Sequence, residues 1–168
     1  EICIRDSLGT YRKSHIPGFP AYEEAFYFSP GDTGFRVWDT RYVKLGAAVC
    51  WDQWFPEAAR AMALMGAELL VYPTAIGRPV EESPYDFPNS LPHWQRTMQG
   101  HAAANMVAVA PSNRVGVERG GAFSTQFSGG PFIADETGLT VAELGEDAGE
   151  FELPAVDLRR ISAFRPGS

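Results

Sequence analysis

A short run of apolar residues in the first third of the chain predicts a buried strand. The run extends from Leu45 to Val49, and its small and β-branched residues are typical of a strand covered on both faces. A helix is expected to begin at Pro56, because proline suits the first helical turn, and to end near Gly66. Cys50 therefore lies on a strand-to-helix turn, where a side chain can be exposed over the end of a sheet.

Two further apolar runs repeat this arrangement. Residues 68–73 predict a second buried strand, residues 92–105 a helix and residues 106–111 a third strand. Two successive strand–helix–strand units favour parallel pairing. Ligands bind such sheets at the carboxyl ends of the strands, so the segments that follow the first two strands are expected to meet at one site.

Shorter alternating patterns predict three hairpins, which pair residues 1–5 with 10–16, 35–38 with 42–49, and 131–134 with 140–144. Residues 150–153 predict a last short strand. Two segments rich in glycine, serine, proline or acidic residues, at 78–92 and 120–130, are interpreted as loops. Residues 157–168 are interpreted as a tail or a docking segment.

Composition narrows the class of protein. The 168 residues suit one domain or part of one, with 45% apolar and 21% charged residues. The net charge of −7 argues against nucleic acids and anionic membranes as partners, and no apolar run is long enough to span a bilayer. Cys3 and Cys50 make no disulfide framework, so reduced thiols in the cytoplasm are expected. The chain opens like an interior strand without a starting methionine, which indicates a longer parent protein.

Cys50 has two interpretations. Most cysteines after an apolar strand are small buried hydrophobic residues, and the position alone favours neither this role nor a catalytic one. The polar, aromatic-flanked turn from Trp51 to Trp54 favours a nucleophile, because a core cysteine needs no such turn.

Other candidates remain open on the residues alone. A lysine on an extended segment, such as Lys13, is usually solvated. Glu23 and Glu24 precede an aromatic cluster at residues 26–28, which could hold a carboxylate in a partly dry site or pin a surface loop. His93 and His101 lie on one predicted helix without a third ligand at metal spacing, so no zinc site is expected.

Three segments together resemble the carbon–nitrogen hydrolase (nitrilase) superfamily in order and spacing: residues 11–17, 22–34 and 46–57. Residues 51–60, 72–77 and 93–105 are similar to its N-carbamoylputrescine amidase branch, and the resemblance covers nearly the whole chain. It implies an α/β fold, the nitrilase-like α-β-β-α sandwich. Residues 1–168 would form a single hydrolase domain that corresponds to the C-terminal portion, without the upstream segment that carries the first catalytic glutamate.

The resemblance also implies roles for individual residues. Cys50 would be the nucleophile, Lys13 would stabilise the oxyanion, and Glu24, unlike Glu23, would position the lysine and the substrate. A nearby ammonium lowers the pKa of a thiol and so activates it. The main-chain N–H of Trp51 would complete the oxyanion site. The expected substrate-binding residues are Trp51, Trp54, Thr74, Ala75 and Tyr22.

The implied reaction is cleavage of the carbamoyl C–N bond of N-carbamoylputrescine or a similar linear ureido amine, without a cofactor or metal. Three acidic residues, Glu81, Glu82 and Asp86, would meet the distal ammonium or form a solvated loop. The expected partners are a small-molecule substrate and further copies of the chain, in a homo-oligomer built from dimers. The alternatives are another amidase, such as a β-ureidopropionase-like enzyme, and a catalytically inactive truncated homologue that acts as a binding subunit.

Overall fold

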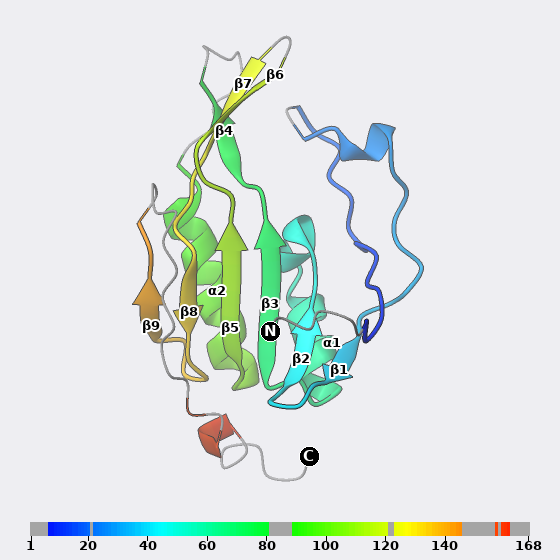
Figure 1. Cartoon of the computed structure of the whole chain (residues 1–168), viewed down its shortest axis with the longest axis vertical. Helices are drawn as coiled ribbons and strands as arrows, with labels where there is room; N and C mark the ends of the chain where they lie inside the picture. Colours follow the sequence, from blue (N-terminus) through cyan, green and yellow to red (C-terminus); the bar gives the residue numbers. More distant parts are fainter. Residues whose placement is uncertain are drawn as a thin grey trace, which may run out of the picture.

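Six strands form the central sheet of the computed structural model, which describes residues 7–20, 22–80, 89–120, 123–145, 157 and 159–161 (Figure 1). Their order in the sheet is β1 (Val37–Asp39), β2 (Lys44–Ala47), β3 (Leu69–Thr74), β5 (Ala108–Asn113), β8 (Phe132–Ala134) and β9 (Thr140–Glu143). The three central strands, β2, β3 and β5, are parallel, and the outer pairs are antiparallel. The predicted parallel pairing is therefore confirmed, as are the hairpins at residues 35–49 and 131–144.

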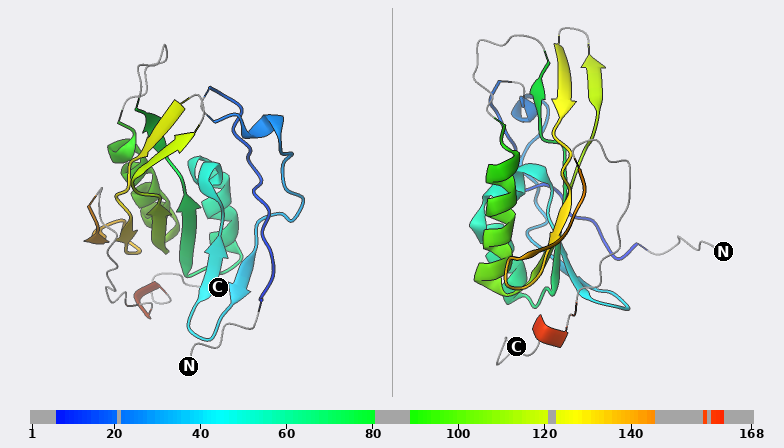
Figure 2. Two further views of the ribbon diagram at one scale, coloured as in Figure 1. Left: turned by 45° about the horizontal axis from the view of Figure 1, so that its top comes forward. Right: turned by 90° about the vertical axis from the view of Figure 1, so that its left-hand side faces the viewer.

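Two helices cover one face of this sheet (Figure 2, right). The first, α1 (Pro56–Leu64), and the second, α2 (Leu91–Asn105), occupy the predicted helical segments. Each places buried side chains three or four residues apart, so each presents one apolar stripe to the sheet. The core between the helices and the sheet includes Met62, Leu70, Tyr72, Trp94, Met98 and Val109. Burial of this stripe fixes both helices beneath the parallel strands.

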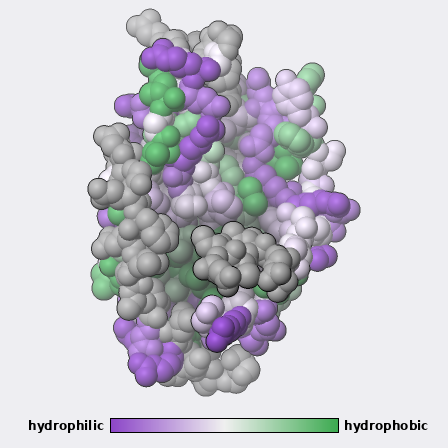
Figure 3. Space-filling model, viewed as in Figure 1, coloured by the Kyte–Doolittle hydropathy of each residue, from purple (hydrophilic) through white to green (hydrophobic). Residues whose placement is uncertain are grey.

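The opposite face of the sheet is also apolar. The register sets Leu45 beside Leu69 and Val71 beside Ala110, and these side chains are half-buried. Figure 3 shows apolar side chains on this face of the molecule. The helices and the sheet thus form two adjacent layers, α and β, of the expected α-β-β-α sandwich. The second apolar face of the sheet is the face on which a further layer would pack.

A second sheet of three strands extends beyond the carboxyl ends of β3 and β5 (Figure 1). Its order is β4 (Gly77–Pro79), β7 (Phe123–Phe127) and β6 (Val117–Gly120). The interpretation of residues 120–130 as a loop is therefore wrong, and the predicted loop at 78–92 begins with a strand. Strand β7 pairs along both edges, and this tertiary pairing outweighs the glycine- and serine-rich composition around it.

The N-terminal segment, residues 7–34, lies beside β1 and β2, and its described part contains a short 3-10 helix, η1 (Glu24–Phe26). The predicted strand at residues 10–16 is wrong. This segment bends at Ser14, and its N–H groups bond to side chains rather than to a neighbouring strand: Arg12 N to the Thr33 hydroxyl (3.0 Å) and His15 N to Asp52 (2.8 Å). The predicted strands at residues 1–5 and 150–153 lie outside the described residues.

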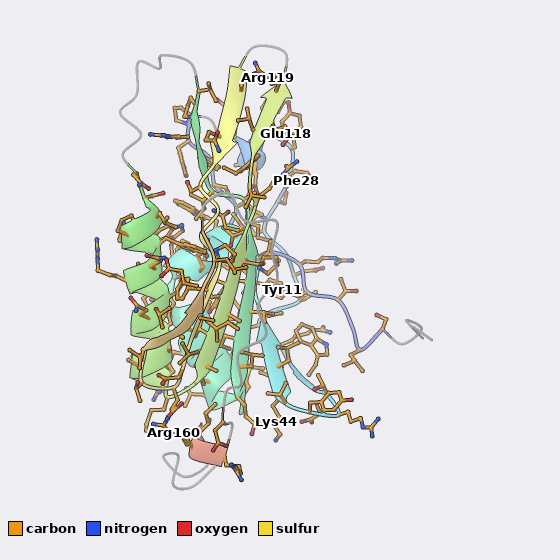
Figure 4. The ribbon with its side chains drawn as sticks, turned by 60° about the vertical axis from the view of Figure 1, so that its left-hand side comes forward. Tyr11, Phe28, Lys44, Glu118, Arg119 and Arg160 are labelled. Carbon is orange, nitrogen blue, oxygen red and sulfur yellow. The ribbon has the colours of Figure 1, made fainter. Side chains whose placement is uncertain are left out.

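Four residues of the predicted tail are described. Ile161 is buried, and Arg160 Nε lies 3.0 Å from the buried carboxylate of Glu136. Figure 4 places Arg160 at the same end of the molecule as Lys44, the first residue of β2. These residues therefore dock at the end of the sheet remote from Cys50.

Candidate active site

Cys50 lies on the turn that joins β2 to α1. The 3-10 helix η2 (Cys50–Trp54) begins at this residue, and the backbone of Cys50 is in the left-handed region with φ of 48°. Such a conformation is costly for a residue with a side chain, and strain of this kind is often kept at functional sites. The thiol is free and half-buried. The predicted strand–turn–helix geometry is therefore present.

Asp52 is fully buried in this turn, as is its neighbour Gln53. Its Oδ2 accepts hydrogen bonds from the Tyr11 hydroxyl (2.8 Å) and from Val49 N (3.1 Å). Its Oδ1 lies 2.8 Å from both the main-chain N and the ring Nδ1 of His15. Tyr11 and His15 flank Lys13, so Asp52 holds the lysine-bearing segment against the Cys50 turn. Figure 4 shows Tyr11 on this segment, beside the sheet.

Lys13 forms an ion pair with Glu24, with Nζ 2.6 Å from Oε2. The lysine side chain is only 13% exposed and the glutamate side chain 36%. A hollow of about 550 Å³ opens beside the pair, lined by both side chains and by residues 28–32. Glu23, in contrast, is exposed. The structure therefore brings Glu24, and not its neighbour, to the predicted lysine.

The loop after Glu24 returns to the lysine segment. The main-chain N of Gly31 donates to the carbonyl of Lys13 (2.8 Å), and the guanidinium of Arg12 pairs with Asp32 (2.7 Å). At Gly31 a side chain would collide with the main chain of Arg12. The loop can approach this closely only because the residue is a glycine.

Tyr22 connects this loop to Gly77, the first residue of β4. Its hydroxyl donates to the carbonyl of Gly77 (2.9 Å) and accepts from the N–H of the same residue (3.0 Å). The pKa of Tyr22 is raised, mainly by burial; the hydrogen bond with Gly77 opposes this rise and the charge of nearby Cys50 adds to it. Tyr22 thus lies within electrostatic reach of the thiol.

Aromatic rings form a wall beside the turn. The ring of Trp51 lies 4.9 Å from that of Phe19 and 6.4 Å from that of Trp54, centroid to centroid. Trp54 in turn lies 5.0 Å from the exposed ring of His93 on α2. Both predicted tryptophans therefore belong to one continuous half-buried surface next to Cys50.

Gln53 ties the turn to β3 and α2. Its Oε1 accepts hydrogen bonds from Trp94 Nε1 (2.5 Å) and from the Thr74 hydroxyl (3.2 Å). Its carbonyl lies 2.8 Å from Nε2 of the buried His101, which therefore carries its proton on that nitrogen. Burial lowers the pKa of His101, and the bond to Gln53 opposes this shift. Thr74 thus supports the turn, and half-buried Ala75 follows it.

The structure separates the remaining candidates. His93 and His101 face different surroundings, and no group of three His, Cys, Asp or Glu side chains in the described ranges could hold a metal ion. None of the described helices is both long and apolar enough to cross a membrane. Cys3, Glu81, Glu82 and Asp86 lie outside the described residues.

Sequence reasoning missed Asp52, Tyr11 and Gln53 as parts of the site. One signal was present: an acid and an amide occur together between two tryptophans, directly after a buried strand. Polar side chains in such a position are buried only with partners, so they indicate a network.

A family model described as carbon–nitrogen hydrolase matches residues 4–166. The chain belongs to the carbon–nitrogen hydrolase family. It is 52% identical over 164 residues to the N-carbamoylputrescine amidase of Solanum tuberosum, covering 95% of this chain and 54% of that protein. It is 49% identical over 158 residues to the citrullinase of Francisella tularensis, covering 94% of this chain and 54% of that protein. The chain thus spans about half the length of these relatives.

Solved structures of carbon–nitrogen hydrolases share the fold. The crystal structure of the enzyme from Helicobacter pylori G27 matches with a TM-score of 0.83 and 44% identity, covering 93% of this chain and 54% of that one. A mutant amidase from Nesterenkonia sp. AN1, with acrylamide added at its active site cysteine, matches with a TM-score of 0.70 and 30% identity. This match covers 90% of this chain and 54% of that one. The nitrilase-like fold predicted for the chain is confirmed.

Proposed function

We propose that the chain carries the thiol and lysine of an amidohydrolase that acts on N-carbamoylputrescine or a similar linear ureido amine. The sulfur of Cys50 attacks the carbamoyl carbon and forms a tetrahedral intermediate. Ammonia leaves and a carbamoyl thioester remains on the sulfur. Water then attacks this thioester, restores the thiol and releases a carbamate, which decomposes to carbon dioxide and the amine.

In this proposal the ion pair of Lys13 and Glu24 places an ammonium where negative charge develops on the carbamoyl oxygen. The N–H of Trp51, at the start of η2, adds a second donor. Preorganised donors of this kind lower a barrier by roughly 3–4 kcal/mol each. The thiol proton passes to a general base, for which the family resemblance implies a glutamate upstream of the lysine segment, and from there to the departing nitrogen.

The observation that carries the proposal is the position of Cys50. A free, half-buried thiol lies on a strained turn at the carboxyl end of a parallel strand, within electrostatic reach of Tyr22, and Asp52 holds the Lys13 segment against the same turn. The names of the relatives support the choice of a carbamoylated amine as substrate.

A second candidate substrate is citrulline. The chain is nearly as similar to a citrullinase as to the N-carbamoylputrescine amidases. Citrulline carries the same terminal ureido group, so the same attack would release ammonia from it. The two substrates differ at the far end, where citrulline adds a carboxylate to the amine.

Ammonia release from purified protein tests the proposal. The substrates are N-carbamoylputrescine, citrulline and N-carbamoyl-β-alanine, and we expect the first to have the highest kcat/KM. Cys50→Ala should abolish release while the melting temperature stays near that of the wild type. Cys3→Ala changes the chain's other cysteine and should leave turnover unchanged. Turnover retained by Cys50→Ala would contradict the thiol mechanism, and no release from any ureido compound would favour a non-catalytic binding subunit.

A further inference from the structure

We propose that Asp52 is a positioning residue, whose carboxylate fixes the ammonium of Lys13 relative to the sulfur of Cys50. This inference rests on the proposed function, because it assigns to the lysine a role beside the thiol. Asp52 itself is two residues from Cys50 and is fully buried, so it acts on the reaction through the segments that it holds.

The contacts of Asp52 join two parts of the chain that are distant in sequence. Oδ1 takes two donors from His15, one from the main chain and one from the ring, each at 2.8 Å. Oδ2 takes the hydroxyl of Tyr11 at 2.8 Å and the N–H of Val49 at 3.1 Å. Lys13 lies midway between Tyr11 and His15. A lysine segment that is not part of any sheet is therefore fixed on both sides of its functional residue.

Aromatic packing supports the same arrangement. The ring of His15 stacks on that of Phe55 at 3.6 Å between centroids and 10° between planes. On another side it lies 6.2 Å from Phe35. Phe55 follows η2 directly, so His15 contacts the Cys50 turn through its ring as well as through Asp52. The stacking restricts rotation of the His15 ring, so its Nδ1 stays directed toward the carboxylate of Asp52.

The site requires a carboxylate and not an amide. All four partners donate, which suits a group that only accepts hydrogen bonds. An asparagine at this position would turn its NH₂ group toward either Val49 N–H or His15 N–H, and two donors would then face each other. The mismatch arises in both orientations of the amide, so Asp52→Asn must loosen one side of the clamp.

Displacement of Lys13 and loosening of the fold should change the alkylation rate of Cys50 in opposite directions. The rate therefore distinguishes a positioning role of Asp52 from a purely structural one. If the ammonium moves away, the sulfur loses a nearby positive charge and Cys50 reacts more slowly with iodoacetamide. If the turn instead opens, the half-buried thiol becomes accessible and reacts faster. The sign of the change in alkylation rate therefore reports which event has occurred.

The experiment compares the purified wild type with Asp52→Asn, Tyr11→Phe and Lys13→Ala. The readouts are the alkylation rate of Cys50 at neutral pH, followed by peptide mass mapping, and kcat and KM for ammonia release. We expect Asp52→Asn to slow alkylation as Lys13→Ala does, and to lower kcat on the order of 100-fold with KM nearly unchanged, as misplacement of a reacting group by about 1 Å does. Tyr11→Phe removes one donor without adding atoms and should lower both the alkylation rate and kcat about 10-fold. This variant keeps the inference testable even if Asp52→Asn does not fold.

Matched controls are available on the surface. Asp39→Asn makes the same chemical change at a side chain that is 82% exposed, and Tyr42→Phe removes a hydroxyl from a tyrosine that is 81% exposed. Both should keep wild-type rates of alkylation and turnover.

The inference is overturned if Asp52→Asn and Tyr11→Phe alkylate at the wild-type rate or faster, or if Lys13→Ala leaves the alkylation rate unchanged. A different outcome would overturn the proposed function alone: slower alkylation in all three variants together with ammonia release that persists in Cys50→Ala. In that case Asp52 still positions the lysine beside the sulfur, but the sulfur is not the nucleophile.

Discussion

The hydroxyl of Tyr22 bonds to both polar main-chain groups of one residue, Gly77, although 55 positions separate them in sequence. This double contact links the loop that carries Glu24 to the start of β4. A hydroxyl that both donates to and accepts from one residue fixes distance and direction together. Tyr22, predicted as a substrate-binding residue, thus has a structural role in the site.

Tyr22→Phe should destabilise the protein. The change leaves the N–H and the carbonyl of Gly77 without this partner, and loss of such a bond costs about 1–2 kcal/mol. Thermal or urea unfolding would measure the change. Tyr27→Phe is the control, because Tyr27 is 76% exposed and its loss should change stability by less than about 0.5 kcal/mol. Equal effects of the two variants would contradict a role for the contact with Gly77.

Cys50→Gly should be more stable than Cys50→Ala by about 1 kcal/mol, because only glycine adopts the left-handed conformation without a steric penalty. Both variants lack the sulfur, so their comparison isolates the backbone. Urea denaturation measures the difference. Ala47→Gly is the control: at this position in strand β2, replacing alanine by glycine should lower stability by about 0.5–1 kcal/mol. If glycine lowers stability at both positions, the turn is not strained.

The unfolding free energy should decrease in acid because of His101. Burial lowers the pKa of this histidine below its ordinary value of 6.5, so between these two values the unfolded chain binds more protons than the folded one. The stability contribution of the neutral ring is therefore complete above pH 6.5 and is lost as the pH falls below it.

The variant His101→Gln tests this, with urea unfolding at pH 8 and pH 5. The wild type should lose more stability between the two values than the variant does. His93→Gln replaces an exposed histidine of the same helix and should keep the wild-type dependence. Parallel curves for the wild type and His101→Gln would show that the buried ring does not contribute.

Gly31→Ala should impair both stability and turnover. Its methyl group would collide with the main chain of Arg12, so the loop must withdraw from Lys13, at a cost of about 1–3 kcal/mol. Melting temperature and kcat for ammonia release are the two measurements. Gly145→Ala is the control, since no atom lies within 4 Å of the added carbon. A Gly31→Ala protein with wild-type kcat would show that this loop does not hold the lysine in place.

The parts of the fold that follow local rules were predictable from sequence. The apolar run ending at Val49 and the proline at position 56 predict the turn that carries Cys50, and the structure has the strand β2, the helix α1 and this turn between them. Periodicity likewise predicts α2, with its buried Trp94 and Met98 four residues apart.

The lysine segment could not be predicted, since its hydrogen-bond partners are remote. Its alternation resembles a strand, but its N–H groups bond to Thr33 and Asp52, which no local pattern connects to it. Strand β7 was missed for a related reason: it is stabilised by pairing with two neighbouring strands, while the glycines and serines around it are typical of loops. The pairing of Lys13 with Glu24 came from the family resemblance, and spacing alone left it open.

The way residues 7–34 are held has a consequence for how the protein opens. The described residues of this segment belong to no strand of either sheet, and much of the segment's attachment to the rest of the protein runs through the side chains of Asp52 and Tyr22. Its amides should therefore exchange with deuterium far sooner than those of β3 or β5, and a protease should cut near the exposed aromatic residues 26–28 while the sheet stays intact. Under the proposed function, ammonia release would then fade on gentle heating before the core melts, as two separate transitions.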